Sequence, residues 1–240
     1  MTTSTGNGHS AHIDTASNSR KAAPKGSIDT ASSQSGVGSG LSIADIFDLF
    51  ARKGQQQYDG EAVTHLQHAL QTALLAEEAH ADCELIVACL LHDLGHMLPA
   101  STVPGSESLP QQVHQNRVLP LLRPLFGPGV LDPIKLHVDA RRYLCATEAG
   151  YYASLSASAL LSLEQEGGVF DAEQVDQFIR QPHAAQAVAL RRWDDKARRA
   201  DWVTPDLDWF AKYLEQAAKR RQVKLQHDAI SSAKPGRKPG

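Results

Sequence analysis

The segment Leu85-Ile86-Val87-Ala88-Cys89-Leu90-Leu91-His92-Asp93-Leu94-Gly95-His96 decides the fold. Its first part, through Leu91, is apolar on every side, which is typical of a helix buried in a protein core. His92 and His96 are one helical turn apart, and the two oxygens of Asp93 can reach one metal ion and bridge to a second. The simpler alternative is a helix end at which the two histidines cap carbonyl groups.

Helical periodicity continues on both sides of this segment. Upstream, Leu66, Ala69, Leu70, Ala73 and Leu74 recur at the spacing of one helix face. No alternating strand pattern stands out, so the sequence predicts an all-α protein with a single helical bundle over residues 41–222. Downstream we expect a loop over 101–110 and helices over 113–122, 130–144, Ser156 or Ser158 to Gly167, Asp171 to Pro182, 184–199, and from a Thr204 cap onward.

The two ends of the chain differ in composition from the predicted bundle. Residues 1–40 are rich in Ser, Thr, Gly and Asn and show no helical or strand period, so we expect a disordered tail. Residues 223–240 carry several lysines and arginines and predict a flexible basic tail. The single domain is expected between these two tails.

Composition excludes several classes of function. The chain has 240 residues and a formal net charge of −3, without the basic surplus of a nucleic-acid binder. No apolar run reaches the ~18–20 residues that a membrane span needs. Cys83, Cys89 and Cys145 form no C-x-x-C pair, so neither a disulfide framework nor a cysteine zinc site fits. We therefore expect a cytoplasmic protein with no nucleic-acid partner and no membrane association.

Histidines are the most informative residues in the composition. Besides His92 and His96, three lie in or next to periodic helices: His68, His114 and His137. Each alone is readily explained as a hydrogen-bonded core residue. Several buried imidazoles without partners are costly, and a shared metal centre satisfies them together. Imidazoles with carboxylates suit iron or manganese and leave zinc open.

Two arginines lie close to these candidate ligands in the sequence. Arg191 shares a helix face with Asp194, and Arg141 shares one with His137. A surface salt-bridge cluster is the alternative to a functional role. Next to a metal, two guanidinium groups favour an anionic substrate group such as phosphate or phosphonate. A helix beginning near Ser156 and Ser158 would add backbone N–H donors.

Together these residues resemble a known family. The order His68 … His92-Asp93 … Asp194 resembles the H…HD…D signature of the HD-domain superfamily, most of whose members are metal-dependent phosphohydrolases. The chain from Tyr58 to Pro205 is similar to the PhnZ/TmpB group of mixed-valence di-iron oxygenases, which cleave carbon–phosphorus bonds. The segments that carry this likeness are Tyr58-Asp59-Gly60-Glu61, Leu66-Gln67-His68-Ala69-Leu70-Gln71, Leu90-Leu91-His92-Asp93-Leu94-Gly95-His96, Leu136-His137, Arg142-Tyr143-Leu144-Cys145-Ala146 and Arg191-Arg192-Trp193-Asp194-Asp195.

The resemblance implies a role for each candidate residue. It implies one iron held by His68, His92, Asp93 and Asp194, and a second held by the bridging Asp93 with His114 and His137. It also implies that Tyr58 caps the second iron and swings out with Glu61 when substrate enters. The implied substrate-binding residues are His96, Arg141, Arg191, Ser156 and Ser158.

The activity that follows is oxidative cleavage of a small organophosphonate. The resemblance implies a Fe(II)/Fe(III) pair that uses O2 to convert a 1-hydroxyphosphonate into phosphate and a carboxylic acid. Substrates could be 2-amino-1-hydroxyethylphosphonate, giving glycine, or its N-trimethyl analogue, giving betaine. Two alternatives stay open at this point. One is an HD-type phosphohydrolase acting on a nucleotide or phosphomonoester, and the other is a regulatory module that binds a phosphorylated ligand without catalysis.

Overall fold

The computed structural model describes residues 40–58, 61–99 and 114–232, and within these ranges it contains helices, one isolated β-bridge and no strand. The predicted all-α fold is confirmed. Expectations for residues 1–39 and for the loop over 101–110 lie outside the described residues. The elements are α1 (Ile43–Lys53), α2 (His65–Glu78), α3 (Cys83–Leu91), the 3₁₀ helix η1 (Leu94–Met97), α4 (His114–Leu122), α5 (Pro128–Thr147), α6 (Tyr151–Ser154), α7 (Ala157–Gln165), α8 (Ala172–Ile179), α9 (Ala184–Asp194) and α10 (Leu207–Ser232).

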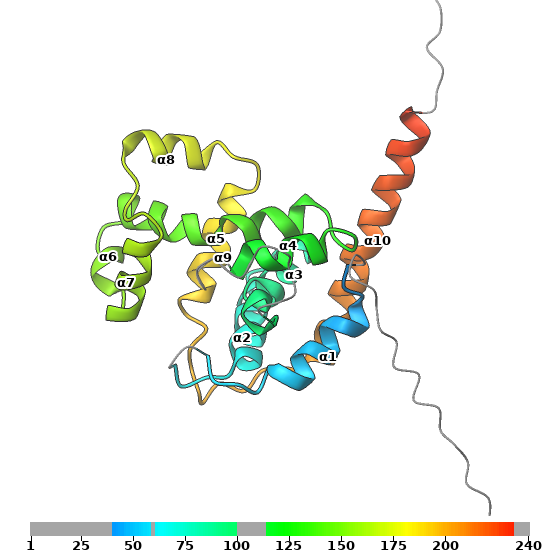
Figure 1. Ribbon diagram of the computed structural model, residues 1–240, viewed down its shortest axis with the longest axis horizontal. Coiled ribbons are helices and arrows are strands. Elements are labelled where there is room, and N and C mark those ends of the chain that lie inside the picture. The colour runs from blue at the N-terminus through cyan, green and yellow to red at the C-terminus, as the bar shows by residue number, and fades with distance from the viewer. Residues whose placement is uncertain (1–39, 59–60, 100–113, 233–240) are drawn as a thin grey trace, which may run out of the picture. The chain divides into compact units, whose positions relative to one another are not determined.

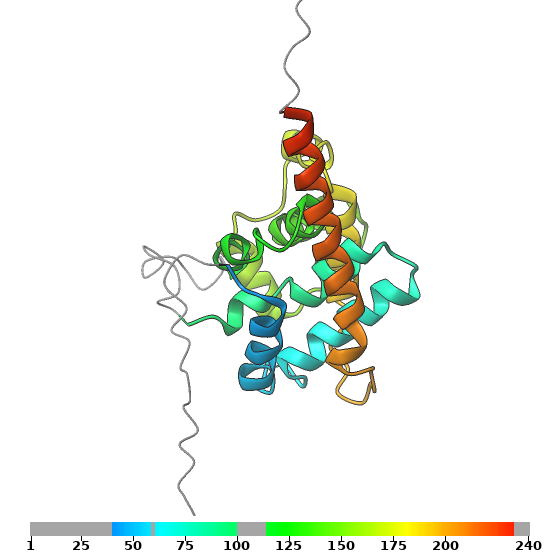
Figure 2. The same cartoon turned by 90° about the vertical axis from the view of Figure 1, so that its right-hand side faces the viewer.

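The apolar segment forms α3, the central helix of the bundle (Figures 1 and 2). Asp82 caps it by accepting a hydrogen bond from the Leu85 backbone N–H. Every residue of α3 except Glu84 is buried, and the helix packs against α2, α5, α9 and α10. A helix surrounded in this way must be apolar on all sides, as its sequence is.

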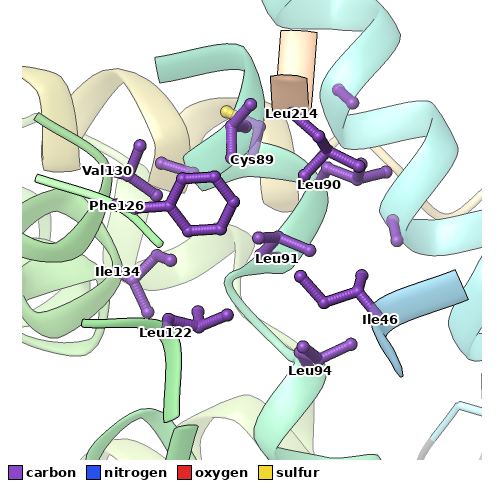
Figure 3. Close-up of a cluster of buried hydrophobic side chains, with 14 of the residues drawn as sticks. Ile46, Cys89, Leu90, Leu91, Leu94, Leu122, Phe126, Val130, Ile134 and Leu214 are labelled. Carbon is purple, nitrogen blue, oxygen red and sulfur yellow. The ribbon is translucent and has the colours of Figure 1, made fainter. Parts of the chain in front are cut away.

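The core gathers around the C-terminal half of α3, as Figure 3 shows. Leu90 and Leu91 pack with Phe126, Ile134 and Leu214, and each of these side chains is buried. Burying one such side chain contributes roughly 1.5–3 kcal/mol relative to leaving it exposed. This packing fixes the end of α3, and His92 and Asp93 follow directly from it.

Several helix boundaries differ from the sequence expectation. The helix α9 ends at Asp194 rather than at residue 199. The helix α10 begins at Leu207, because the Asp206 carboxylate accepts the backbone N–H of Trp209 and caps the helix in place of Thr204. It continues to Ser232, past the expected domain boundary at residue 222.

Two further helices were not expected from the sequence. The first, α1, begins with a capping box in which Ser42 and Asp45 satisfy each other's backbone N–H. The second, α6, is a single turn that follows Gly150. No helix in the described part of the chain combines the length and apolar character needed to cross a membrane.

Candidate metal centre

Four side chains from three parts of the chain meet in the interior. His68 lies on α2, His92 and Asp93 follow α3, and Asp194 is the last residue of α9. His68 Nε2 is 3.3 Å from His92 Nε2 and 3.3 Å from Asp194 Oδ1, and His92 Nε2 is 3.3 Å from Asp93 Oδ2. We call His68, His92, Asp194 and the Oδ2 of Asp93 the inner cluster. All four side chains are buried.

A second group of imidazoles faces the other oxygen of the same carboxylate. His114, the first residue of α4, places Nε2 3.0 Å from Asp93 Oδ1 and 3.2 Å from His137 Nε2. His137 on α5 and His96 on η1 each place Nε2 3.8 Å from Asp93 Oδ1. We call His96, His114, His137 and this oxygen the outer cluster. Asp93 therefore divides its two oxygens between two sets of histidines.

Backbone carbonyls orient three of these rings. The Nδ1 atoms of His68, His92 and His137 donate to the carbonyl oxygens of Ala197, Cys89 and Ile134, at 2.7, 2.9 and 2.7 Å. A neutral ring that donates from Nδ1 presents an unprotonated Nε2 to the cluster, as metal-binding histidines do. The turn that ends α9 is what brings the Ala197 carbonyl to His68.

The arrangement fits metal ions better than it fits hydrogen bonds. Because both rings donate from Nδ1, His68 Nε2 and His92 Nε2 face each other at 3.3 Å and need a proton or a metal ion between them. In addition, Asp194 Oδ1 is buried and accepts no hydrogen bond. A metal ion bound by the inner cluster would resolve both conflicts, and the nitrogen and oxygen donors suit iron or manganese and leave zinc open.

Charges at Asp93 and His137 match the forms that bind metals, whereas His92 must first lose a proton. Burial opposes ionisation of Asp93, but His92 and His114 hold the pKa of its carboxyl well below the usual range. Burial, reinforced by charge on His114, lowers the pKa of His137 to about 3, so its ring is neutral. Burial also opposes charge on His92, yet Asp93 and Asp194 raise its pKa to about 9, so a metal must displace a proton there.

A cavity of about 330 Å³ opens onto the two clusters. Its wall includes Tyr58, Glu61, His96, Arg141, Ser158 and Arg191, all six of which were singled out from the sequence. Ser156 is outside this wall, because its hydroxyl caps α7 by accepting the Ala159 backbone N–H at 3.2 Å.

Each arginine singled out from the sequence has a carboxylate partner. Arg191 lies 2.8 Å from Asp194 Oδ2 and also contacts Asp195 and the Tyr151 hydroxyl. Arg141 pairs with Glu166. Both guanidinium groups are buried and face the cavity, so an arriving anion must share or replace these carboxylates.

Tyr58 lies nearer the inner cluster than the resemblance implied. Its hydroxyl donates to Asp93 Oδ2 at 2.7 Å, and its ring stacks on His68 with centroids 4.3 Å apart. Glu61 pairs with Arg198 at 2.7 Å, and Arg198 also lies 3.6 Å from Asp194 Oδ1. The phenol therefore contacts the Asp93 oxygen that faces His68 and His92, rather than the oxygen that faces His114 and His137.

Sequence reasoning missed several residues of the site, notably Arg198, Glu166, Tyr151 and His65. Arg198 and Glu166 line the cavity, Tyr151 contacts Arg191, and His65 stacks beside His96. Arg198 and Glu61 are 137 positions apart, so no local period reveals their pairing. Glu166 directly precedes Gly167-Gly168, and in the sequence these two glycines indicated only the end of a helix.

Comparison with known proteins agrees with this geometry. Residues 66–144 match the HD domain family. The chain is 40% identical over 177 residues to a hydroxymethylphosphonate dioxygenase of Gimesia maris, covering 73% of this chain and 88% of that protein. It is 36% identical over 168 residues to the [1-hydroxy-2-(trimethylamino)ethyl]phosphonate dioxygenase (glycine-betaine-forming) of Leisingera caerulea, covering 70% and 86%. An uncharacterized protein of Acanthamoeba polyphaga mimivirus is 27% identical over 175 residues, covering 72% and 80%. The chain belongs to the HD-domain family of phosphonate dioxygenases.

Proposed function

We propose that this protein is a di-iron oxygenase that uses O2 to cleave the C–P bond of a 1-hydroxyphosphonate. One O2 and one substrate give one phosphate and one carboxylic acid, which balances all atoms. The names of the relatives support the oxygenase activity and the class of substrate. The single observation that carries the two-metal proposal is that Asp93 turns one oxygen to each of two histidine clusters.

The positions of the donor atoms support one set of ligands for each proposed metal. His68, His92, Asp194 and Asp93 Oδ2 would hold one iron, and His114, His137 and Asp93 Oδ1 the other. Together the irons would supply the electron transfer to O2 that cleavage of a C–P bond requires, since that bond has no ester oxygen to leave by hydrolysis. His96 is also close enough to Asp93 Oδ1 to act as a ligand, but its place on the cavity wall favours contact with the phosphonate.

The remaining residues of the cavity would bind and orient the substrate. Arg141 and Arg191 face the cavity from α5 and α9 and match a phosphonate in charge and shape. Ser158 lies on the same wall, and its hydroxyl, which is 3.0 Å from the Ser156 hydroxyl, offers a further donor. Tyr58 donates to Asp93, and Arg198 pairs with Glu61 close to Tyr58. Tyr58 and Glu61 would move away from the metals together when substrate enters the cavity.

The experiment that tests this function measures oxygen and phosphate together. We expect iron-loaded enzyme to consume O2 only with a 1-hydroxyphosphonate and to release about one phosphate per O2. The substrates are hydroxymethylphosphonate, 2-amino-1-hydroxyethylphosphonate and its N-trimethyl analogue. Release of phosphate from p-nitrophenyl phosphate or nucleotides without O2 would instead indicate a phosphohydrolase.

A further inference from the structure

A buried glutamine, Gln71, ties α2 to a segment 128 positions later in the chain. It lies three residues after His68 and is 0% exposed. Its Nε2 donates to the Arg199 carbonyl oxygen at 2.7 Å, and its Oε1 accepts the Arg199 backbone N–H at 3.1 Å. Both polar ends of one buried side chain are therefore bonded to the backbone of one residue. We call this arrangement the Gln71 clamp.

The clamp holds a segment that has no regular secondary structure of its own. The helix α9 ends at Asp194, and the turn after it includes a bond from the Ala197 N–H to the Asp194 carbonyl oxygen at 3.2 Å. Residues 197–199 are neither helical nor part of a strand, and the Arg199 side chain is 62% exposed. Packing therefore holds Arg199 only weakly, and the two bonds to the buried Gln71 fix its backbone.

The same segment supplies the hydrogen-bond acceptor of the metal-ligand candidate on α2. The Ala197 carbonyl oxygen accepts from His68 Nδ1 at 2.7 Å, and Ala197 is 0% exposed. Because residues three apart lie on the same face of a helix, His68 and Gln71 both face this segment and bind it two residues apart. The clamp therefore fixes the backbone to which the His68 ring is bonded.

The other two oriented rings have acceptors that a helix already fixes. The Nδ1 atoms of His92 and His137 donate to the carbonyl oxygens of Cys89 and Ile134, each three residues earlier in the chain. These two carbonyls belong to α3 and α5. The acceptor of His68 lies outside any helix, so among these three rings His68 is the one whose orientation depends on a distant segment.

We propose that Gln71 is a positioning residue of the inner cluster: it fixes residues 197–199, holds the Ala197 carbonyl against His68 and so keeps the unprotonated Nε2 of that ring directed at the metal. This inference rests on the proposed function in one respect, the presence of a metal ion at the inner cluster. Partners of this kind fix the tautomer and the orientation of a histidine ligand, and loss of one typically lowers metal affinity about 10- to 100-fold. Gln71 acts through the Ala197 carbonyl, so we expect the lower end of this range.

Hydrogen exchange in the full-length wild-type protein tests the clamp without any variant. The Arg199 amide lies in an exposed, non-helical segment, but its N–H is bonded to the buried Gln71. We therefore expect it to exchange at least about 10-fold more slowly than the same residue in an unstructured peptide. Exchange at the rate of the peptide would show that the clamp does not hold the segment and would overturn the proposal.

The variant Gln71→Met keeps the length of the side chain and removes both bonds of the clamp. The readout is exchange of the imidazole Nδ1–H protons, followed by NMR in full-length, zinc-loaded protein with ¹⁵N-labelled histidine. We expect exchange at His68 to become at least about 10-fold faster, and exchange at His92 and His137 to stay within about 3-fold, because their acceptors lie on their own helices. Equal acceleration of all three would show a general loss of stability, and unchanged exchange at His68 would show that its acceptor is fixed without Gln71. Either result would overturn the proposal.

Metal affinity gives a second readout with a matched control. Fe²⁺ is titrated without O2 in competition with a chelator, and we expect Gln71→Met to weaken the tighter of the two sites about 10-fold and the other by less than about 3-fold. The control is Thr72→Val, because the Thr72 hydroxyl is also buried on α2 but donates at 2.8 Å to the His68 carbonyl within the same helix. Thr72→Val should leave the tighter site within about 3-fold of wild type even if Tm falls. Equal losses in the two variants would contradict a specific role for Gln71.

Turnover separates failure of this inference from failure of the proposed function. With a 1-hydroxyphosphonate, Gln71→Met should lose activity at limiting iron and recover kcat to within about 3-fold of wild type when iron is in excess. A loss of kcat that excess iron does not restore, with wild-type metal affinity, would contradict the positioning role and leave the proposed function intact. If no phosphonate releases phosphate, the proposed function fails, and the exchange rates and metal affinities still decide the role of Gln71.

Discussion

The inner and outer clusters share Asp93 but are supported differently. In the inner cluster, both rings donate from Nδ1 to backbone carbonyls, and the two histidines are 0% exposed. In the outer cluster, His137 has such a bond, whereas His114 Nδ1 is buried without a partner and the His96 side chain is 15% exposed. The inner ligands come from α2, from the two residues after α3 and from α9, and the outer ones include the first residue of α4.

This difference indicates that the fold alone orients the ligands of the inner cluster, whereas the ligands of the outer cluster depend on the metal for their final positions. Carbonyl partners fix the ring orientation and raise the basicity of a histidine ligand. The inner cluster has both partners, the Cys89 carbonyl on α3 and the Ala197 carbonyl in the turn after α9, so its rings are oriented before a metal binds. His114 lacks one and relies on its contacts with Asp93 and His137. We therefore expect tighter metal binding at the inner cluster.

The largest effect should come from the residue that the two clusters share. Asp93→Asn removes the negative charge between them, so metal content should fall from about two ions per chain to well under one. The measurement is metal content by mass spectrometry after equilibrium dialysis. Asp195→Asn, which changes a carboxylate that contacts Arg191 rather than either cluster, is the matched control. Retention of two metals by Asp93→Asn would refute the bridging role.

The next largest effect should separate the two clusters. His114→Ala should keep about one metal ion per chain, because the inner cluster retains all its ligands. His68→Ala should lose the inner ion and, since Asp93 then loses a neighbour that fixes it, should weaken the outer ion as well. Metal titrations of the two variants test this asymmetry. Identical losses in both would mean that the clusters are equivalent.

A smaller effect is expected at Gly95, which lets η1 approach the start of α4. A Cβ at this position would lie 2.0 Å from the His114 carbonyl oxygen, so Gly95→Ala must displace His114. Crowding of this kind costs about 1–3 kcal/mol of folding stability. We expect a lower Tm and weaker binding at the outer cluster, with the inner metal retained. Thermal unfolding and metal titration report the two effects separately, and wild-type affinity at the outer cluster would exclude the positioning role.

The smallest effect on metal content is expected for Tyr58→Phe. The change removes the hydrogen bond to Asp93 but no ligand, so the protein should still bind about two metal ions. What should change is the rate of O2 uptake without substrate, because the phenol covers the Asp93 oxygen next to His68 and His92. Unchanged uptake, followed with an oxygen electrode, would leave Tyr58 without a role at the metals.

Much of the fold follows from local patterns in the sequence. The apolar segment before His92 indicated a buried helix, Asp171 marked where α8 begins, and of the two expected caps Ser156 and Ser158 it is Ser156 that begins α7. Helix boundaries were harder to predict where two nearby residues can cap the same helix. Thr204 was the expected cap of α10, but the Asp206 side chain caps it. The helix α1 was missed because it lies next to a tail without periodicity.

The candidate site was predictable in its histidines and less so in its ion pairs. Several histidines on apolar helix faces of one domain indicated a shared centre, and the structure brings His68, His92, His114 and His137 together. Glu166 and Arg198 are ordinary charged residues in the sequence. Their significance depends on partners in distant segments, Arg141 and Glu61, so only the folded chain reveals it.

The most direct test of the two-metal account is iron content measured together with the electron paramagnetic resonance spectrum of partly reduced protein. A carboxylate that bridges two irons couples their spins. The account predicts about two irons per chain and the signal of a coupled Fe(II)/Fe(III) pair. One iron per chain, or two irons that give only uncoupled signals, would contradict it.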